Sequence, residues 1–291
     1  MRIRRPFVRP NENIYLCRLI NCLTMRLSHL LTPLIVLTVC SCSGYQRLLK
    51  SGEPEEKYKR AVEYFDKKDY MRAQTLLSDV SAYYKGTEES QDVLRYLCES
   101  YEGMKDYDNA IDYYKTYIRS FPRGKYVQLA KYKIGYCYYK QSPDARLDQT
   151  MTNQAVSSLQ EFIDVYPESQ YVPEANRLLD ELFNKLAYKE LLNARLYRNL
   201  GTYRGDNYQS AIIAANNALK KYPTSDSREE LMFIILQARY EQARASMEEL
   251  QHERYESAFD EYYSYVNEYP EGRFKKQADK IKAELDAILK K

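Results

Sequence analysis

The stretch Tyr107-Asp108-Asn109-Ala110, followed by an amphipathic run that ends at Phe121-Pro122, decides the fold of this chain. Its alanine lies twelve residues before the proline. The same spacing recurs in four further copies, the first of which has lysine in place of proline. These copies pair Ala73 with Lys85, Ala155 with Pro167, Ala211 with Pro223, and Ala258 with Pro270. Five copies at one spacing predict a repeat protein, whose function resides in surfaces rather than in one catalytic cleft.

The composition favours long amphipathic helices. Charged residues make up 29% of the 291 residues, and only 9 Gly and 10 Pro interrupt the chain. The sequence shows no alternating strand pattern of useful length. Tyrosine is unusually abundant, with 31 Tyr against 8 Phe and no Trp. Because its ring is apolar and its hydroxyl needs a partner, we expect most of these tyrosines to pack between helix layers.

Each repeat is interpreted as two antiparallel helices. A turn lengthened by eight residues, within Gln141–Thr152, is expected in the third pair, and a polar turn at Glu248–Arg254 in the fifth. The fifth pair begins near Ser227, and Phe274–Lys291 is expected to cap the array with its polar side outward. The helical segments delimited by the patterns are 55–68, 70–84, 89–104, 106–121, about 173–200 and 274–291.

Small residues occupy matched positions within these pairs. Ala61, Cys98 and Gly135 fall where paired helices would cross, and a tyrosine follows each of them three residues later. Small side chains let helix axes approach closely, and proline ends the second helix because it cannot continue the hydrogen-bond ladder. This is the tetratricopeptide (TPR) pattern. The expected fold is therefore all-α, a TPR α-solenoid of about five helix pairs plus a C-terminal capping helix.

Residues 25–41 are interpreted as an export signal. Met25 and Arg26 precede an apolar core, Leu30–Val39, which small residues follow. A spanning helix would need about 20 apolar residues, so the pattern indicates a leader. Residues 1–24 are unlike a leader, and one hypothesis is that they precede the true start codon, Met25.

The end of this leader resembles the acylation site of bacterial lipoproteins. In Val39-Cys40-Ser41-Cys42, Cys42 fits better than Cys40 because the residue before it is small. We expect lipidation at Cys42; the alternative is two incidental cysteines in an ordinary secretory signal. Acyl chains contribute about 0.8 kcal/mol per buried CH₂, which holds a protein at a membrane surface. Residues 43–47 contain no acidic residue, which favours the periplasmic face of the outer membrane, as in the lipoproteins that the segment resembles.

The charge balance does not support nucleic-acid binding. The formal net charge is +3, but residues 1–41 contain six Lys or Arg and one acid. The remaining 38 basic and 40 acidic residues give a net charge of −2, and phosphate binding needs a clustered basic surplus.

Cys98 and Cys137 lie in helical patterns, so buried free thiols are expected, with a disulfide as the alternative.

Catalysis finds little support in the sequence. His252 is the single histidine after residue 41, and the motifs of serine hydrolases, zinc proteases, dithiol enzymes and phosphate loops are missing. Acidic pairs such as Glu248-Glu249 are most simply solvated helix faces rather than a glycosidase pair. We expect a protein that is not an enzyme and has no cofactor and no metal site.

A further regularity follows the closing prolines. Pro122, Pro167 and Pro270 are each followed four residues later by an aromatic residue, and four residues beyond it by Ala130, Ala175 or Ala278. With the Cys42 motif, the Gly44-Tyr-Gln-Arg-Leu-Leu-Lys-Ser start, the hairpin from Tyr64 to Ala73 and the five pairs, residues 42–291 resemble the BamD (YfiO) family of outer-membrane protein assembly lipoproteins. The long insertions and tyrosine-rich helices look like its Bacteroidetes branch. Departures are Lys85 and the extended turns, which affect surface contacts rather than the fold.

This resemblance implies a non-enzymatic, lipid-anchored subunit of the β-barrel assembly (BAM) complex. Its N-terminal repeats would bind unfolded outer-membrane protein precursors, and its C-terminal repeats would dock on the periplasmic domains of BamA. The implied organisation is a leader over 1–41, a lipidated tether over 42–54, repeats one to three over 55–170, and repeats four and five with the capping helix over 171–291.

First helices of such repeats line the concave side, which supplies candidate peptide contacts. Aromatic residues there suit the aromatic end of a barrel strand, and Arg95 or Lys140 its terminal carboxylate. The alternative is a solvated groove with some buried tyrosines. The candidates are Tyr58, Phe65, Arg95, Glu99, Glu102, Tyr132, Tyr136, Tyr139 and Lys140.

Two other functions stay open. A cell-envelope scaffold like the Tol-Pal-associated repeat proteins is the first, although these usually lack a lipid anchor. A glycan-binding repeat lipoprotein is the second, although such proteins should be larger and rich in Trp. Co-purification of a BamA-type barrel, of peptidoglycan-binding partners, or retention on polysaccharide would distinguish the three functions.

Overall fold

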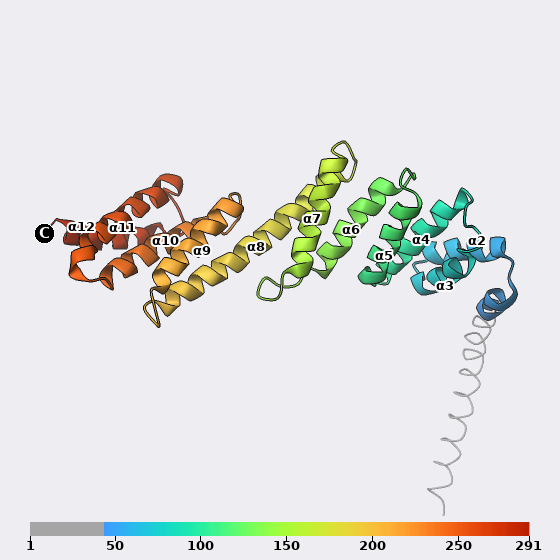
Figure 1. Cartoon of the computed structure of the whole chain (residues 1–291), viewed down its shortest axis with the longest axis horizontal. Helices are drawn as coiled ribbons and strands as arrows, with labels where there is room; N and C mark the ends of the chain where they lie inside the picture. Colours follow the sequence, from blue (N-terminus) through green and yellow to red (C-terminus); the bar gives the residue numbers. More distant parts are fainter. Residues whose placement is uncertain (1–43, 291) are drawn as a thin grey trace, which may run out of the picture. The chain divides into compact units, whose positions relative to one another are not determined.

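The computed structural model describes residues 44–290 of the protein, and all regular secondary structure in that range is helical (Figure 1). The predicted leader, the start at Met25 and the acylated Cys42 lie outside the described residues. Residues 44–51, within the predicted tether, form a helix. None of the helices within 44–290 combines the length and apolar character needed to cross a membrane.

The helices follow the predicted pairs closely. The long first helix of the fourth pair is confirmed as α8, and the capping helix as α12. The bounds are α2 (Pro54–Asp66), α3 (Tyr70–Val80), α4 (Glu89–Gly103), α5 (Tyr107–Ser120), α6 (Val127–Gln141), α7 (Thr150–Val165), α8 (Val172–Leu200), α9 (Asn207–Lys221), α10 (Arg228–Arg244), α11 (Glu248–Glu268) and α12 (Lys275–Leu289).

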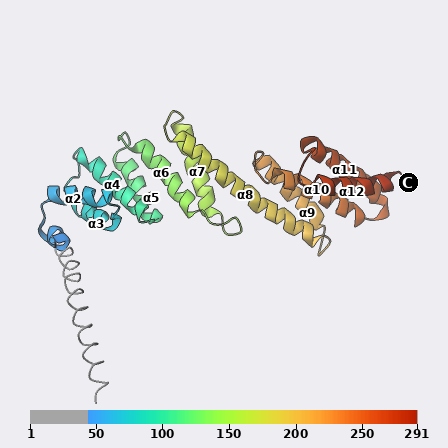
Figure 2. The same ribbon diagram turned by 180° about the vertical axis from the view of Figure 1, so that it is seen from behind.

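The chain forms two compact units, one ending at Tyr96 and one beginning at Leu97. In the first unit, α2 packs against α3. In the second unit, each helix from α5 to α12 packs against the next, and α6, α8, α10 and α12 also contact one another in succession (Figure 2). This layering of first helices on first helices is the TPR-like solenoid arrangement that the repeats predict. The predicted division at residue 170 stays a prediction.

Small side chains lie where the paired helices meet. Ala61, Ala73 and Cys98 are fully buried, as are the repeat alanines at 110, 155, 211 and 258. Gly135 of α6 lies so close to α7 that an added Cβ would be 2.7 Å from the Leu159 side chain and 3.2 Å from its backbone nitrogen. The predicted buried thiols are also confirmed, because Cys98 and Cys137 are free and buried.

The turns within the first two pairs share one construction. Lys68 and Lys105 adopt positive φ angles of 61° and 62°, and each is followed by an aspartate that caps the next helix. In the first turn, the Lys68 amide donates to the Phe65 carbonyl (2.8 Å) and the Asp69 amide to the Tyr64 carbonyl (2.9 Å). This is a Schellman motif joined directly to an N-cap, which reverses the chain within three residues.

Tyrosine hydroxyls fix the connections from one pair to the next. The Tyr126 amide at the start of α6 donates to the Tyr117 hydroxyl (3.1 Å), and the Phe274 amide at the start of α12 donates to the Tyr265 hydroxyl (3.2 Å). Both hydroxyls satisfy a backbone donor that begins a helix, where no carbonyl of the same helix is available. Tyr265 also donates to Glu229 Oε1 (2.9 Å).

Two expectations about helix ends are wrong. Glu248–Arg254 is not a turn but the first part of α11, which begins after the extended residue Met247. Glu248 and Glu249 occupy its first turn, where carboxylates interact favourably with the helix dipole. Helix α3 ends at Val80 rather than at Tyr84. Residues 81–86 form turns, and Gly86 at their end has a φ angle of 88°.

We predict that Gly135→Ala lowers the free energy of unfolding by about 1 kcal/mol. Overpacking against Leu159 costs roughly 1–3 kcal/mol, which outweighs the gain of up to about 1 kcal/mol in helix propensity. Chemical denaturation measures the change, and the difference between Gln128→Ala and Gln128→Gly, at an exposed position of the same helix, is the control for propensity alone. Unchanged or higher stability would show that α6 and α7 are not in close contact.

We also predict that Tyr265→Phe lowers the free energy of unfolding by about 1–3 kcal/mol at neutral pH, because the Phe274 amide and the Glu229 carboxylate both lose a partner. Burial raises the pKa of Glu229, but hydrogen bonds from Arg273 and Tyr265 outweigh it and hold this pKa below its ordinary value. Tyr263→Phe, at an exposed position of the same helix, is the control.

The same substitution has a defined pH dependence. Because the folded-state pKa of Glu229 is lowered, its stabilisation is complete above the usual glutamate pKa of about 4.3 and is lost as pH falls through the lower folded-state value. The difference between wild type and Tyr265→Phe should therefore shrink in acid. A difference that is constant from pH 7 to pH 3 would contradict the role of the Glu229 carboxylate.

Candidate functional site

Three candidate residues lie in the first unit and are engaged in aromatic contacts there. The Tyr58 ring packs on Tyr84 at 5.3 Å, and the Phe65 ring meets Tyr96 edge-on at 5.0 Å. The Arg95 guanidinium lies over the Tyr96 ring at 3.9 Å. Burial, followed by the charge of Asp92, raises the pKa of Tyr58 to about 12, so its hydroxyl stays protonated.

Glu99 and Glu102 lie on the part of α4 that belongs to the second unit, and both are half-buried. Glu102 accepts a hydrogen bond from the Tyr114 hydroxyl (3.0 Å) and forms an ion pair with Lys133 of α6 (2.6 Å). Its carboxylate therefore links α4 with α5 and α6. Because Glu102 already binds Tyr114 and Lys133, it could bind a ligand only by breaking its ion pair with Lys133.

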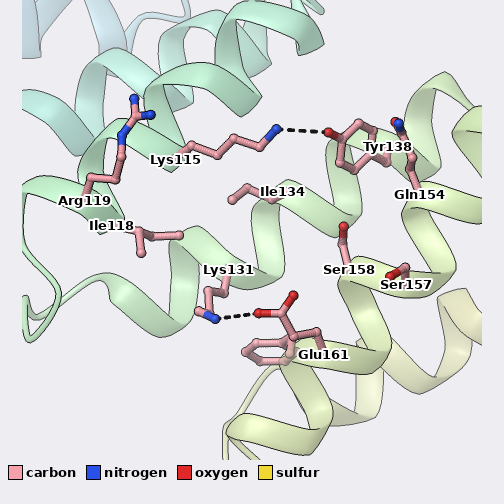
Figure 3. Close-up of a pocket in the computed structure, with 11 residues that line it drawn as sticks. Lys115, Ile118, Arg119, Lys131, Ile134, Tyr138, Gln154, Ser157, Ser158 and Glu161 are labelled. Atoms are coloured by element: carbon pink, nitrogen blue, oxygen red, sulfur yellow. Dashed lines mark hydrogen bonds and ion pairs between the residues drawn. The ribbon is translucent and has the colours of Figure 1, made fainter.

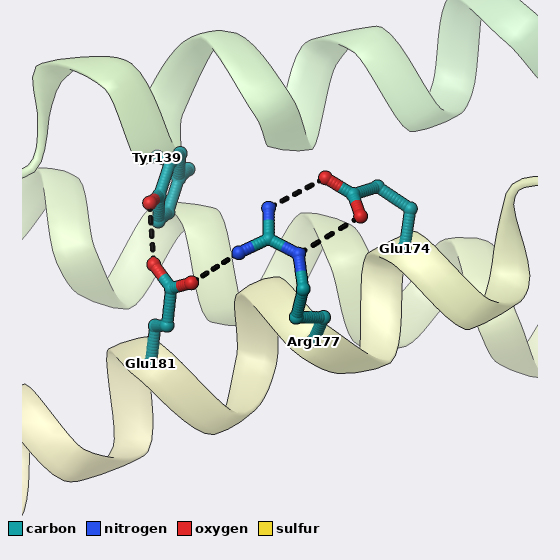
Figure 4. Close-up of polar contacts among 4 residues, drawn as sticks. All are labelled: Tyr139, Glu174, Arg177 and Glu181. Carbon is teal, nitrogen blue, oxygen red and sulfur yellow. Dashed lines mark hydrogen bonds and ion pairs between the residues drawn. The ribbon is translucent and has the colours of Figure 1, made fainter.

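Helix α6 presents two different sides. Ile134 and Tyr138 face a hollow between α5 and α7 (Figure 3). Tyr132, Tyr136 and Tyr139 lie on the other side, at positions that successive helical turns bring together, and α6 contacts α8. In Figure 4 the Tyr139 hydroxyl points toward α8.

Tyr132 is part of the hydrophobic core. Only 6% of its surface is exposed, its ring is stacked on Tyr171 at 5.1 Å and 5°, and it packs with Phe162 at 5.8 Å. Burial, followed by the charge of Glu174, raises the pKa of Tyr132 to about 12. Tyr132 thus supports the side of α6 that faces α8 rather than offering a free ring.

Tyr136 lies between two cations. The Lys133 ammonium is 4.8 Å and the Lys140 ammonium 5.1 Å from the ring centroid of Tyr136, and Lys140 is also 5.6 Å from the Tyr139 ring. Tyr136 is half-buried and Lys140 is exposed. We name Tyr136, Tyr139, Lys133 and Lys140 the aromatic–cation face of α6. Such a face can bind aromatic rings edge-to-face and a carboxylate through the Lys140 ammonium, since Lys133 is already paired with Glu102.

An ordered network borders this face on α8. The Tyr139 hydroxyl donates to Glu181 Oε2 (2.5 Å), Glu181 also binds Arg177, and Arg177 pairs with Glu174 at 2.6 Å (Figure 4). The hydrogen bond to Glu181, together with burial, raises the pKa of Tyr139, and the hydrogen bond from Arg177 lowers the pKa of Glu174. The network fixes the Tyr139 ring and places negative charge at the α8 edge of the face.

The structure therefore brings four of the nine candidates together on α6, namely Tyr132, Tyr136, Tyr139 and Lys140. Sequence reasoning missed the residues that frame them, Tyr171 and Arg177 on the α8 side and Lys133 beside Tyr136. Tyr171 carried a usable signal, because it follows a closing proline at the same distance as Tyr126. Within residues 44–290, no three His, Cys, Asp or Glu side chains form a group that could hold a metal ion.

Comparison with known proteins gives two groups of matches. Relatives include the outer membrane protein assembly factor BamD of Caulobacter vibrioides, 23% identical over 70% of this chain and 67% of that protein, and the putative BamD of Aquifex aeolicus, 25% identical over 71% and 66%. The BamD of Rickettsia prowazekii is 22% identical over 62% and 70%. The TPR2AB domain of yeast Sti1 is a solved structure with a TM-score of 0.39 and 12% identity, covering 80% of this chain and 98% of that one.

The matched region spans about two thirds of the length of each of these relatives. The family described as "YfiO: Outer membrane lipoprotein" matches residues 50–203, which is more than half of the chain. The resemblance inferred from the sequence motifs is thereby confirmed, and the chain belongs to the YfiO family of outer membrane lipoproteins.

Proposed function

We propose that this protein is a lipid-anchored, non-catalytic subunit of the outer-membrane β-barrel assembly complex. The match of residues 50–203 to an outer membrane lipoprotein family carries the proposal, and the relatives named as outer membrane protein assembly factors support it. In this proposal the anchor is an acylated Cys42 and the repeats lie at the periplasmic face of the outer membrane. The protein binds other polypeptides and performs no chemical step.

The aromatic–cation face of α6 is the proposed contact for unfolded barrel precursors. Tyr136 offers a half-buried ring between two ammonium groups, which suits a peptide that carries an aromatic side chain and a terminal carboxylate. Lys140 is exposed and within reach of the same ring. Tyr132 packs beneath this face, with its ring against that of Tyr136. Tyr58, Phe65 and Arg95 supply a separate aromatic and cationic contact in the first unit.

The C-terminal repeats are the proposed docking region for a BamA-type protein. The end of α8 and the loop after it expose large apolar side chains, among them Leu196 (56%), Leu200 and Tyr203 (63%). Contiguous exposed apolar residues mark protein interaction sites in many proteins. Leu196 and Leu200 are four residues apart, so they lie on one side of the helix.

Affinity purification from detergent-solubilised envelopes tests the proposed function. We expect a BamA-type barrel to co-purify with the full chain, and we expect the amount to fall at least several-fold for Leu196→Asp/Leu200→Asp. Lys220→Gln on α9 is a surface control that should keep the barrel. Recovery of peptidoglycan-binding proteins without the barrel would contradict the proposal, and so would a Cys42→Ser variant that stays fully in the membrane fraction.

We predict that Tyr136→Ala/Lys140→Gln weakens binding of a peptide with an aromatic residue and a free C-terminal carboxylate by about tenfold or more. The lost aromatic and cation contacts are each worth roughly 0.5–1.5 kcal/mol. Fluorescence anisotropy measures the affinity. Tyr263→Ala removes an exposed tyrosine from α11, away from both proposed peptide sites, and is the control.

Amidation of the peptide C-terminus separates the two contributions. If Lys140 binds the carboxylate, amidation should weaken binding to the wild-type protein but not to the Tyr136→Ala/Lys140→Gln variant. Equal binding by the Tyr136→Ala/Lys140→Gln and Tyr263→Ala variants, with the helical content of both preserved, would rule out the aromatic–cation face as the peptide site.

A further inference from the structure

The hollow between α5 and α7 is a second candidate binding site, on the side of α6 away from the aromatic–cation face. Its volume is about 550 Å³, within the range of about 300–1,000 Å³ that is usual for ligand pockets. Ile118 and the edge of Ile134 contribute apolar surface, and the fully buried Phe162 lies behind them (Figure 3). Three cations, one acid and three neutral polar side chains surround it. We name this feature the α5–α7 groove.

The α5 wall of the groove carries two cations that bind only neutral partners. Lys115 donates to the Tyr138 hydroxyl oxygen (3.2 Å), and Arg119 donates to Thr116 Oγ1 (3.0 Å). Within residues 44–290, neither takes part in an ion pair. The third cation, Lys131, is neutralised by Glu161 at 2.8 Å. The groove therefore has an excess of two positive charges, both on α5.

This pair of cations is not required by the repeat. Counted from the repeat alanine, the positions of Lys115 and Arg119 are occupied in the other second helices by Ser78 and Ala82, Gln160 and Asp164, Asn216 and Lys220, and Tyr263 and Asn267. No other copy has a cation at both positions. The two cations are therefore particular to the second pair, and their place beside a hollow makes them candidate contacts for an anionic ligand.

The facing wall on α7 carries one carboxylate, Glu161, which is paired with Lys131 of α6, and is otherwise neutral and rich in hydrogen-bonding groups. Gln154, Ser157 and Ser158 line the groove there. Because the Tyr138 hydroxyl accepts from Lys115, its own proton is directed to another acceptor. Amide and hydroxyl groups of this kind pair with either the N–H or the C=O of a peptide main chain. An apolar floor, one cationic wall and one neutral polar wall match an extended polypeptide that carries carboxylates along one edge.

We propose that the α5–α7 groove binds an extended, acidic segment of a partner protein, with carboxylates at alternate positions on Lys115 and Arg119. The spacing supports this partner, since four residues of an α-helix advance by about 6 Å and two residues of an extended chain by about 6.6 Å. The proposal does not depend on the peptide site of the aromatic–cation face.

The test uses the full chain in a neutral detergent and a labelled synthetic peptide of Gly, Ser and Asp with Asp at every second position. Lys115→Gln/Arg119→Gln should weaken binding about tenfold at low ionic strength, because two charge-assisted contacts are lost. Arg146→Gln/Lys220→Gln removes two exposed cations elsewhere and should leave the affinity within about twofold of wild type. Ser157→Lys should tighten binding, since it adds a cation to the neutral wall.

A second peptide of the same composition, with its Asp residues consecutive, tests the spacing and should bind several-fold more weakly. The proposal is overturned if the Lys115/Arg119 variant binds the alternating peptide as wild type does, or if the two peptides bind equally. It is also overturned if phosphatidylglycerol vesicles, but neither peptide, show binding that depends on Lys115 and Arg119. That outcome would assign the groove to lipid headgroups.

Discussion

The close approach of paired helices at small side chains is the constraint on which the rest of this structure depends. Where Gly135 meets Leu159, there is no room even for a methyl group, and the repeat alanines at 110, 155, 211 and 258 are all fully buried. Because each contact fixes the rotation of two helices about their axes, it also decides which side chains face the next pair. The succession of α6, α8, α10 and α12 in the second unit follows from it.

Tyrosine is abundant because this architecture can use both ends of the side chain. At Tyr117 and Tyr265 the ring is buried between helices, while the hydroxyl accepts the amide that begins the next helix. At Tyr114 and Tyr262 the hydroxyl instead donates to a carboxylate, on Glu102 or Asp279. Phenylalanine could fill the same space but would leave the backbone donor or the carboxylate without its partner. These four tyrosines are thus structural.

The sequence was sufficient for features set by local spacing and insufficient for those set by tertiary contacts. The helix pairs, the long α8 and the buried alanines could be predicted because proline, small residues and apolar periodicity act within one pair. The start of α11 at Glu248 could not, because a segment with six polar residues among seven looks alike in a turn and in an exposed helix. The difference between Tyr132 and Tyr136 was also hidden, since it depends on where Tyr171 is brought by the turn before α8. The α5–α7 groove needs three helices in place before Lys115 and Tyr138 meet.

The two sides of α6 are bordered by charges of opposite sign, and this favours different ligands on the two proposed sites. Next to the aromatic–cation face, Glu174 and Glu181 place negative charge on α8, so an acidic segment is repelled there unless its carboxylate reaches Lys140. In the α5–α7 groove the one acid is paired with Lys131, and two cations remain for an anionic partner. Successive residues of an α-helix are rotated by about 100° about its axis, so side chains at different positions of α6 face different neighbours. The side that faces α8 therefore disfavours acidic segments, whereas the α5–α7 groove favours them.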